Sequence, residues 1–333
     1  MKYVLFLALA AGAVRAQSWM PQQSGTTASL RGVSAVSAKV EWASGTKGTV
    51  LITTDGGASW QARPVPGAAD LDFRDLHAVN DRMAYLLSAG EGPASRIYKT
   101  TDGGGRWTLL FTNPEPKGFF DAIGFWDESH GIVLGDPADG RFTILTTSDG
   151  ATWQRRKGPQ AGKNESAFAA SGTCLVTRGT REAWFATGGP GGARVFHSAD
   201  GGETWSVAKT PLRNDSASAG IFSLAFSGAR HGVAVGGDYQ KAGEAAGNIA
   251  ISEDGGRTWT APRGTAPGGF RSAVAHADGI EWIAVGTAGS DVSADGGVSW
   301  RKFDDASFYA VGFAPDGAGW AVGPNGAIAR FAP

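Results

Sequence analysis

The sequence predicts an all-β fold, a seven-bladed β-propeller that forms a single ring. One turn, of the form Ser/Thr-x-Asp-Gly-Gly-x-Ser/Thr-Trp, occurs six times, with successive copies 41 to 54 residues apart. A repeat of this length is typical of propeller blades. The chain also contains 51 glycines and 12 tryptophans, a composition that suits many short strands joined by tight turns.

The repeated turn, the Asp-box, has a mechanical explanation. Asp-Gly-Gly supplies the positive φ angles of a hairpin turn, and the carboxylate can accept backbone N–H groups across it. We therefore predict a structural role for the six aspartates and exclude them from any site. Two copies depart from the pattern, because Arg106 replaces the usual Ser or Thr and the copy ending at Trp153 is one residue short. The aspartates are Asp55, Asp102, Asp149, Asp200, Asp254 and Asp295.

The ends of the chain determine the number of blades. Four short strands accompany each Asp-box, but after Trp300 only three more are expected, at residues 308–313, 319–323 and 327–331. The segment Trp19-Met20-Pro21 resembles the strand that follows Trp60. We predict that this N-terminal strand pairs with the last blade, because closure removes two exposed sheet edges. A six-bladed ring would leave the segment from Phe308 onward unexplained.

The first sixteen residues have the pattern of a signal peptide. They contain Lys2, an apolar run over residues 3–14 and a small residue at Ala16. The run is shorter than the ~20 residues of a spanning helix, and no second hydrophobic segment follows it. We therefore expect cleavage near Ala16, a single propeller domain over residues 17–333, and a monomer that is periplasmic or secreted, with no transmembrane segment.

Charge and composition exclude several classes of function. Lys plus Arg number 30 and Asp plus Glu number 31, so the chain lacks the basic excess that nucleic-acid binding requires. Cys174 is the only cysteine and is expected to be a small buried hydrophobe. The Gly-Gly pairs lie in hairpin turns, and the five histidines are scattered one per repeat. We therefore expect no cofactor and no metal site.

The Asp-boxes, together with the segments GWAVG at residues 319–323 and GAI at residues 326–328, resemble the photosystem II stability and assembly factors of cyanobacteria and plants. They resemble more loosely the Asp-box propellers of sialidases and other glycoside hydrolases. The first resemblance covers nearly the whole chain after residue 16 and implies an extracytoplasmic, protein-binding propeller. Members of that family also occur in bacteria that do not photosynthesise, so the resemblance does not imply a photosystem partner.

We expect a ligand site on the face opposite the Asp-box turns, where the loops leading into the innermost strands gather around the channel. Arginine offers paired donors that match a carboxylate, which favours a protein or acidic peptide as ligand, with a glycan as a further candidate. Alternatively, the arginines pair with acids of neighbouring loops and only solvate the rim. The candidate residues are Arg31, Arg74, Phe120, Asp136, Glu165, Phe222, Asp238, Tyr239, Arg271 and Tyr309.

Two functions fit these residues. A sialidase-like glycoside hydrolase would use three arginines, a tyrosine nucleophile at Tyr239 or Tyr309, and acids such as Glu165 and Asp136. Sialidases usually carry Arg-Ile-Pro near the start of the domain, whereas Arg31 is followed by Gly and Val. We therefore favour a protein-binding or assembly scaffold over an enzyme and assign no catalytic residue.

Overall fold

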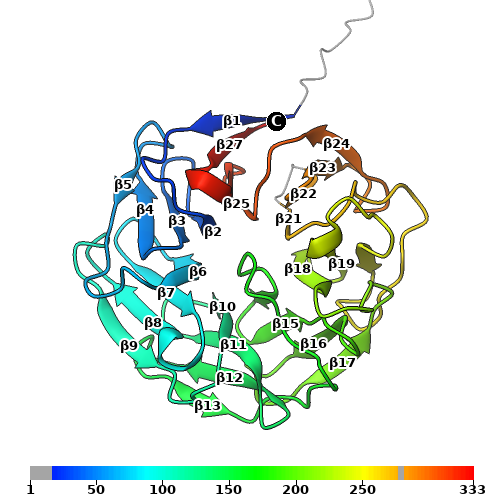
Figure 1. Ribbon diagram of the computed structural model, residues 1–333, viewed down its shortest axis with the longest axis horizontal. Coiled ribbons are helices and arrows are strands. Elements are labelled where there is room, and N and C mark those ends of the chain that lie inside the picture. The colour runs from blue at the N-terminus through cyan, green and yellow to red at the C-terminus, as the bar shows by residue number, and fades with distance from the viewer. Residues whose placement is uncertain (1–16, 277–280) are drawn as a thin grey trace, which may run out of the picture.

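A computed structural model describes residues 17–276 and 281–333 of the chain. Seven small β-sheets stand around a central axis as a closed ring (Figure 1). This confirms the predicted all-β, seven-bladed propeller. The predicted signal peptide, residues 1–16, lies outside the described residues. Among those that are described, no helix is long and apolar enough to cross a membrane. Residues 17–276 and 281–333 include three short 3₁₀ helices, η1 (Gly92–Ala94), η2 (Tyr239–Lys241) and η3 (Pro324–Gly326).

Each blade is an antiparallel sheet, and in blades 1 to 6 the strands run in chain order from the axis outwards. Blade 1 contains β2 (Leu30–Ala35), β3 (Glu41–Gly45), β4 (Thr49–Thr53) and β5 (Gln61–Ala62). Blade 2 contains β6 (Asp72–Ala78), β7 (Ala84–Ala89), β8 (Arg96–Thr100) and β9 (Thr108–Thr112). Blade 3 contains β10 (Phe120–Phe125), β11 (Gly131–Ala138), β12 (Arg141–Thr147) and β13 (Gln154–Arg156). Blade 4 contains β14 (Leu175–Arg178), β15 (Glu182–Ala186), β16 (Arg194–Ser198) and β17 (Ser206–Lys209). Blade 5 contains β18 (Ala219–Ser227), β19 (His231–Asp238) and β20 (Ile249–Ser252). Blade 6 contains β21 (Ala273–Ala275), β22 (Trp282–Gly286), β23 (Gly289–Ser293) and β24 (Arg301–Asp304).

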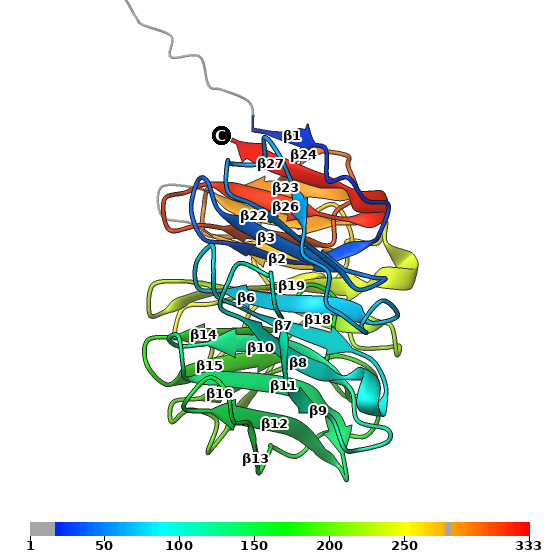
Figure 2. The same cartoon turned by 90° about the vertical axis from the view of Figure 1, so that its left-hand side faces the viewer.

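Blade 7 is completed by the N-terminal strand, as the sequence predicts. Its strands from the axis are β25 (Ala310–Phe313), β26 (Gly319–Val322), β27 (Ile328–Ala332) and β1 (Ser18–Gln22). β1 pairs antiparallel with β27 along its whole length, and the two strands lie side by side in Figures 1 and 2. The Trp19 indole donates a hydrogen bond of 2.9 Å to Ser290 Oγ in blade 6 and packs on Phe308 and Phe331. The seam is therefore held by side chains as well as by the ladder.

Blade 5 is the irregular blade, with three strands where the sequence pattern suggested four. Its outer strand is reduced to one bridge between Ile251 and Thr260. Pro262 follows two residues later and has no N–H group to donate, so the ladder cannot continue.

The hydrophobic core is divided among the interfaces between blades. Seven clusters of buried residues are found, and each joins two neighbouring blades. The cluster across the seam joins Leu30 and Leu51 of blade 1 to Trp320 and Ile328 of blade 7. Because every blade buries both faces only when the ring is closed, closure is a condition for a complete core.

The Asp-box aspartates serve their own turns. Asp55 accepts the Ser59 N–H at 2.9 Å, and each of the other five accepts at least one N–H in its own turn. The Gly56 N–H donates to the carbonyl of Lys39 at 2.9 Å, which ties the Asp-box to the turn between the first two strands. These turns therefore lie together on one face of the ring.

Trp19 tests the importance of the seam. We expect Trp19→Ala to lower the free energy of unfolding by about 3 to 5 kcal/mol, because it removes a nearly buried indole from three aromatic contacts. The neighbouring Met20 is 48% exposed and is the matched control, with an expected change within about 0.5 kcal/mol for Met20→Ala. Urea unfolding measures the free energy of unfolding of both variants. Equal losses would contradict a stabilising role of Trp19 at the seam.

Candidate ligand-binding site

A pocket of about 410 Å³ opens near the axis on the face opposite the Asp-box turns. We call it the central pocket. Its residues come from the segments that lead into the innermost strands and from the turns between the second and third strands, which lie at the strand ends remote from the Asp-boxes. It is lined by Arg31, Arg74, Phe168, Ala169, Ala170, Phe222, Tyr239, Phe270, Ser272, Thr287 and Tyr309.

β-Bulges present the side chains of three innermost strands to this pocket. In blade 1 the register passes from Leu30 opposite Gly45 to Gly32 opposite Ser44, which leaves Arg31 unpaired. The same bulge leaves Arg74 unpaired in blade 2 and Phe222 unpaired in blade 5. A bulge breaks the alternation of side chains and turns the extra residue in a new direction. Arg31, Arg74 and Phe222 are thereby brought together, as the sequence suggested.

The register of the innermost strands also explains why two other candidates are elsewhere. In blade 3 the unpaired residue is Asp121, and Phe120 lies opposite Gly135, at the buried position that Leu30 has in blade 1. In blade 6 Arg271 packs against Gly286 in the same way, and Ser272 takes the position that faces the pocket. An offset of one residue moves a side chain to another face.

Arg271 is therefore a structural residue in this geometry. Its side chain is completely buried and forms an ion pair with Asp291, whose carboxylate accepts the Arg271 Nε–H at 2.6 Å. Only two of the three candidate arginines, Arg31 and Arg74, line the central pocket. Phe120 is likewise buried and packs on Phe111.

Tyr239 and Tyr309 line the pocket, whereas the three candidate acids support loops around it. Glu165 is buried and pairs with Arg194. Asp238 is buried and caps η2, where it accepts the Gln240 N–H at 3.0 Å. Asp136 accepts the Ala167 N–H at 3.0 Å.

A loop of blade 4, residues 166–173, crosses the channel, and we call it the plug loop. Ser171 Oγ donates to the Ser272 carbonyl of blade 6 at 2.9 Å, and the hydroxyl groups of Thr173 and Ser223 share a hydrogen bond of 2.6 Å. Figure 1 shows this green segment, ahead of β15, reaching into the centre of the ring. The plug loop supplies Phe168, which was not among the predicted residues, although the 51 residues between Asp149 and Asp200 indicate extra chain here.

Two carboxyl groups of blade 3, the buried Asp121 and the partly buried Asp136, bind the backbone of the plug loop. Asp136 accepts the Ala167 amide at 3.0 Å, and Asp121 accepts the Ala169 amide. Burial raises the pKa of Asp136 to about 6, and burial together with the neighbouring Asp136 raises the pKa of Asp121 well above its usual range. Burial and the mutual repulsion of two neighbouring carboxylates both disfavour the charged forms of this pair.

The two pocket arginines carry more positive charge than their surroundings compensate. Arg74 donates to Asp72 at 2.7 Å and to the Ala169 carbonyl at 3.2 Å. The Arg31 guanidinium lies over the Tyr309 ring, 4.5 Å from its centroid, and its buried Nε has no hydrogen-bond partner among the described residues. Burial, and then the charge of Arg74, lowers the pKa of Arg31, although a guanidinium stays protonated in proteins. Asp72 acts on both cations, and Asp121, whose burial disfavours its charged form, also interacts with Arg74.

Four rings form the other side of the pocket, and we call them the aromatic wall. Phe168 stacks on Phe222 with 4.0 Å between ring centroids and 5° between planes. Phe270 meets Phe222 edge to face at 4.7 Å, and Tyr239 lies edge-on to both. Tyr239 is 50% exposed, so this side is open to an incoming group.

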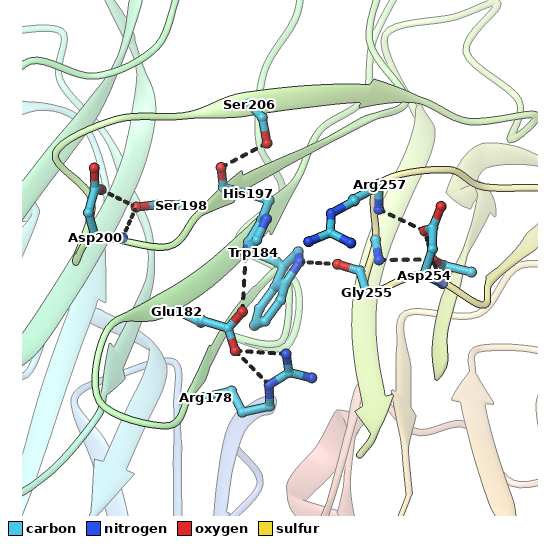
Figure 3. A network of polar contacts seen from close by, with 12 residues as sticks. Arg178, Glu182, Trp184, His197, Ser198, Asp200, Ser206, Asp254, Gly255 and Arg257 are labelled. Carbon is cyan, nitrogen blue, oxygen red and sulfur yellow. Dashed lines mark hydrogen bonds and ion pairs between the residues drawn. The ribbon is translucent and has the colours of Figure 1, made fainter. Parts of the chain in front are cut away.

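A second hollow, of about 430 Å³, lies on the Asp-box face between blades 4 and 5. Figure 3 shows Arg178 paired with Glu182, and Asp254 bound within its own turn. His197 stacks on Trp184 at 4.5 Å, and burial lowers its pKa. Most polar groups here already serve the interface between blades, so the central pocket is the stronger candidate site. Across the part of the chain that the structure describes, no group of three or more His, Cys, Asp or Glu side chains could hold a metal ion.

Fold and pocket define this protein as an Asp-box propeller with a cationic and aromatic site on its axis. The model of the family described as “Photosynthesis system II assembly factor YCF48” matches residues 112–332, more than half of the chain. The chain therefore belongs to that family, which confirms the resemblance seen in the sequence. A comparison with curated proteins gave no match.

Solved structures agree on the fold. A structure described as “YCF48 bound to D1 peptide” is 19% identical with a TM-score of 0.66, over 98% of this chain and 100% of that one. YCF48 from Cyanidioschyzon merolae is 16% identical with a TM-score of 0.66, over 96% and 99%. A streptogramin B lyase, 13% identical, has a TM-score of 0.61 over 95% and 97%. These likenesses show the fold alone, which hosts both binding proteins and enzymes.

A substitution at Gly172 tests how closely the plug loop packs against blade 2. Gly172 has a φ of +75°, and a Cβ there would overlap the Asp75 carboxyl group. Gly179 also has a positive φ, of +57°, but nothing lies within 4 Å of its Cβ position, so Gly179→Ala measures the backbone strain alone. We expect Gly172→Ala to cost about 2 kcal/mol more than the control in chemical unfolding. Equal losses would show that the loop does not depend on this contact.

Asp136→Asn tests the buried carboxyl pair. A carboxyl group whose folded pKa is raised to about 6 contributes stability below its unfolded pKa, near 3.8, and loses it as the pH rises through 6. Asn keeps an acceptor for Ala167 but cannot ionise. The variant should therefore gain stability relative to the wild type between pH 4 and 7.5, on the order of 2 kcal/mol. Asp139→Asn, in the same turn but exposed, is the control for urea unfolding across this range. An identical pH trend in both variants would contradict the assignment.

Proposed function

We propose that this protein is an extracytoplasmic, peptide-binding scaffold of the YCF48 family whose central pocket binds an acidic segment of a partner protein. The observation that carries the proposal is the Arg31–Arg74 pair, two guanidiniums in one pocket with Asp72 as their carboxylate partner. A desolvated cation without a full complement of acceptors favours an anionic ligand, and guanidinium groups match carboxylates.

The comparisons support a peptide as the ligand class. The similar propeller with 19% identity is described as bound to a D1 peptide, which concerns that protein alone. An export signal at residues 1–16 would place the scaffold in the periplasm or outside the cell. For this chain we propose an acidic peptide as ligand and leave the photosystem out of the proposal.

The glycoside hydrolase alternative gains no support from the geometry. That chemistry needs three arginines on one substrate carboxylate, and Arg271 is committed to Asp291 in the core. Glu165, its candidate for the acid that assists the tyrosine, is committed to Arg194. A binding function requires none of these groups to be free.

Charge neutralisation in the pocket tests the proposal. A pool of labelled peptides with Asp and Glu at half of their positions is compared, by fluorescence anisotropy, with a pool in which these residues are Asn and Gln. We expect the wild type to favour the acidic pool, and the double variant Arg31→Gln, Arg74→Gln to bind it at least 10-fold more weakly, since each pairing of a carboxylate with a guanidinium is worth about 1.5 to 3 kcal/mol.

The control removes the same charge from the opposite face. Arg230 and Arg257 are exposed and line the hollow on the Asp-box face, so Arg230→Gln with Arg257→Gln matches the change in net charge. This control should retain wild-type affinity. Equal weakening in both double variants would mean that only the overall charge matters, and undiminished binding after loss of Arg31 and Arg74 would refute the proposed site.

A further inference from the structure

The cationic and aromatic sides of the central pocket meet at the plug loop. Arg74 donates to the carbonyl of Ala169 at 3.2 Å, and the preceding residue, Phe168, stacks on Phe222 in the aromatic wall. Two adjacent residues of the plug loop therefore contact a guanidinium and a ring of the pocket, which brings the cationic and aromatic sides close together. This juxtaposition is more specific than a surface with excess positive charge.

The walls are fixed before any ligand binds. Arg31 is supported by the Tyr309 ring, Phe168 and Phe222 are stacked face to face, and the plug loop is bonded to blades 3, 5 and 6. Side chains whose rotamers are already held lose little entropy when they receive a ligand. A pocket of about 410 Å³ suits a ligand about the size of a dipeptide.

We propose that the central pocket recognises a carboxylate and an aromatic side chain on adjacent residues of a peptide, as in an Asp-Phe pair. Arg31 and Arg74 bind the carboxylate, and the ring packs against the open side of the aromatic wall beside Tyr239. Rings favour such a surface because offset and edge-to-face contacts add to the burial of apolar area. This inference rests on the proposed function and extends it from an acidic ligand to a specific pair of residues.

Four labelled peptides test the pairing. They share one Gly-Ser background and an amidated C-terminus, and they carry Asp-Phe, Asp-Ala, Asn-Phe or Asn-Ala at the centre. The wild type should bind Asp-Phe about 10-fold more tightly than either single replacement, because a factor of ten requires about 1.4 kcal/mol. A fifth peptide with Asp-Leu should bind about 3-fold more weakly than Asp-Phe, since leucine is buried without ring contacts.

Variants separate the two walls. Tyr239→Ala should reduce the preference for Phe over Ala and leave the preference for Asp over Asn intact. Arg31→Gln with Arg74→Gln should do the reverse. Leu109→Ala is the control for loss of an exposed apolar side chain, because Leu109 is 48% exposed on the outer strand β9. It should change neither preference.

The outcomes distinguish the recognition of an Asp-Phe pair from the more general binding of an acidic peptide. Equal binding of Asp-Phe, Asp-Leu and Asp-Ala, with dependence on Arg31 and Arg74, would overturn the aromatic pairing and leave the acidic-peptide function standing. Binding that depends on Phe but is indifferent to Asp would also overturn it. Failure of all the Asp peptides, together with failure of the acidic pool, would remove the proposed function itself.

Discussion

The pairing of β1 with β27 is the constraint on which the rest of the structure depends. It completes blade 7, and it brings blade 1 against blade 7 so that Leu30 and Trp320 share one buried cluster. In the central pocket a second contact joins the same two blades, because Arg31 of blade 1 stacks on Tyr309 of blade 7. A strand pairing near the rim of the ring therefore determines a contact at its axis. Loss of closure would cost both the seventh interface and the geometry of the site.

The fold was predictable because its signals are local. Asp-Gly-Gly dictates a turn wherever it occurs, and six such turns with a tryptophan after each define the pitch of the blades. Closure followed from counting strands at the two ends and from the cost of free edges. The reduced outer strand of blade 5 was missed, although Pro262 was a visible reason against a full ladder.

The site was predictable only in part, because its details depend on register. Arg31, Arg74, Phe222, Tyr239 and Tyr309 were expected near the axis and line the pocket. Arg271 and Phe120 lie one position before the residue that faces the pocket, and no local signal distinguishes Arg271 at a buried position from Arg74 at an open one. The clue was nonlocal, since the partner of Arg271 is Asp291 in β23, two strands away in the same blade. Phe168 was missed because the path of the plug loop is set by contacts with blades 2, 3, 5 and 6, which are distant in the sequence.

The plug loop links stability to recognition. Its amides are held by two carboxyl groups with raised pKa values, and its carbonyl at Ala169 accepts a hydrogen bond from the Arg74 guanidinium of the pocket. A buried pair of this kind costs stability when it ionises, so a sequence selected for stability alone would favour an amide at one of the two positions. The two acids accept hydrogen bonds from the amides of Ala167 and Ala169, on either side of Phe168. These bonds orient the Phe168 ring of the aromatic wall. The carboxyl pair thus lowers the stability of the fold and, in return, fixes the orientation of Phe168 at the surface that a ligand would contact.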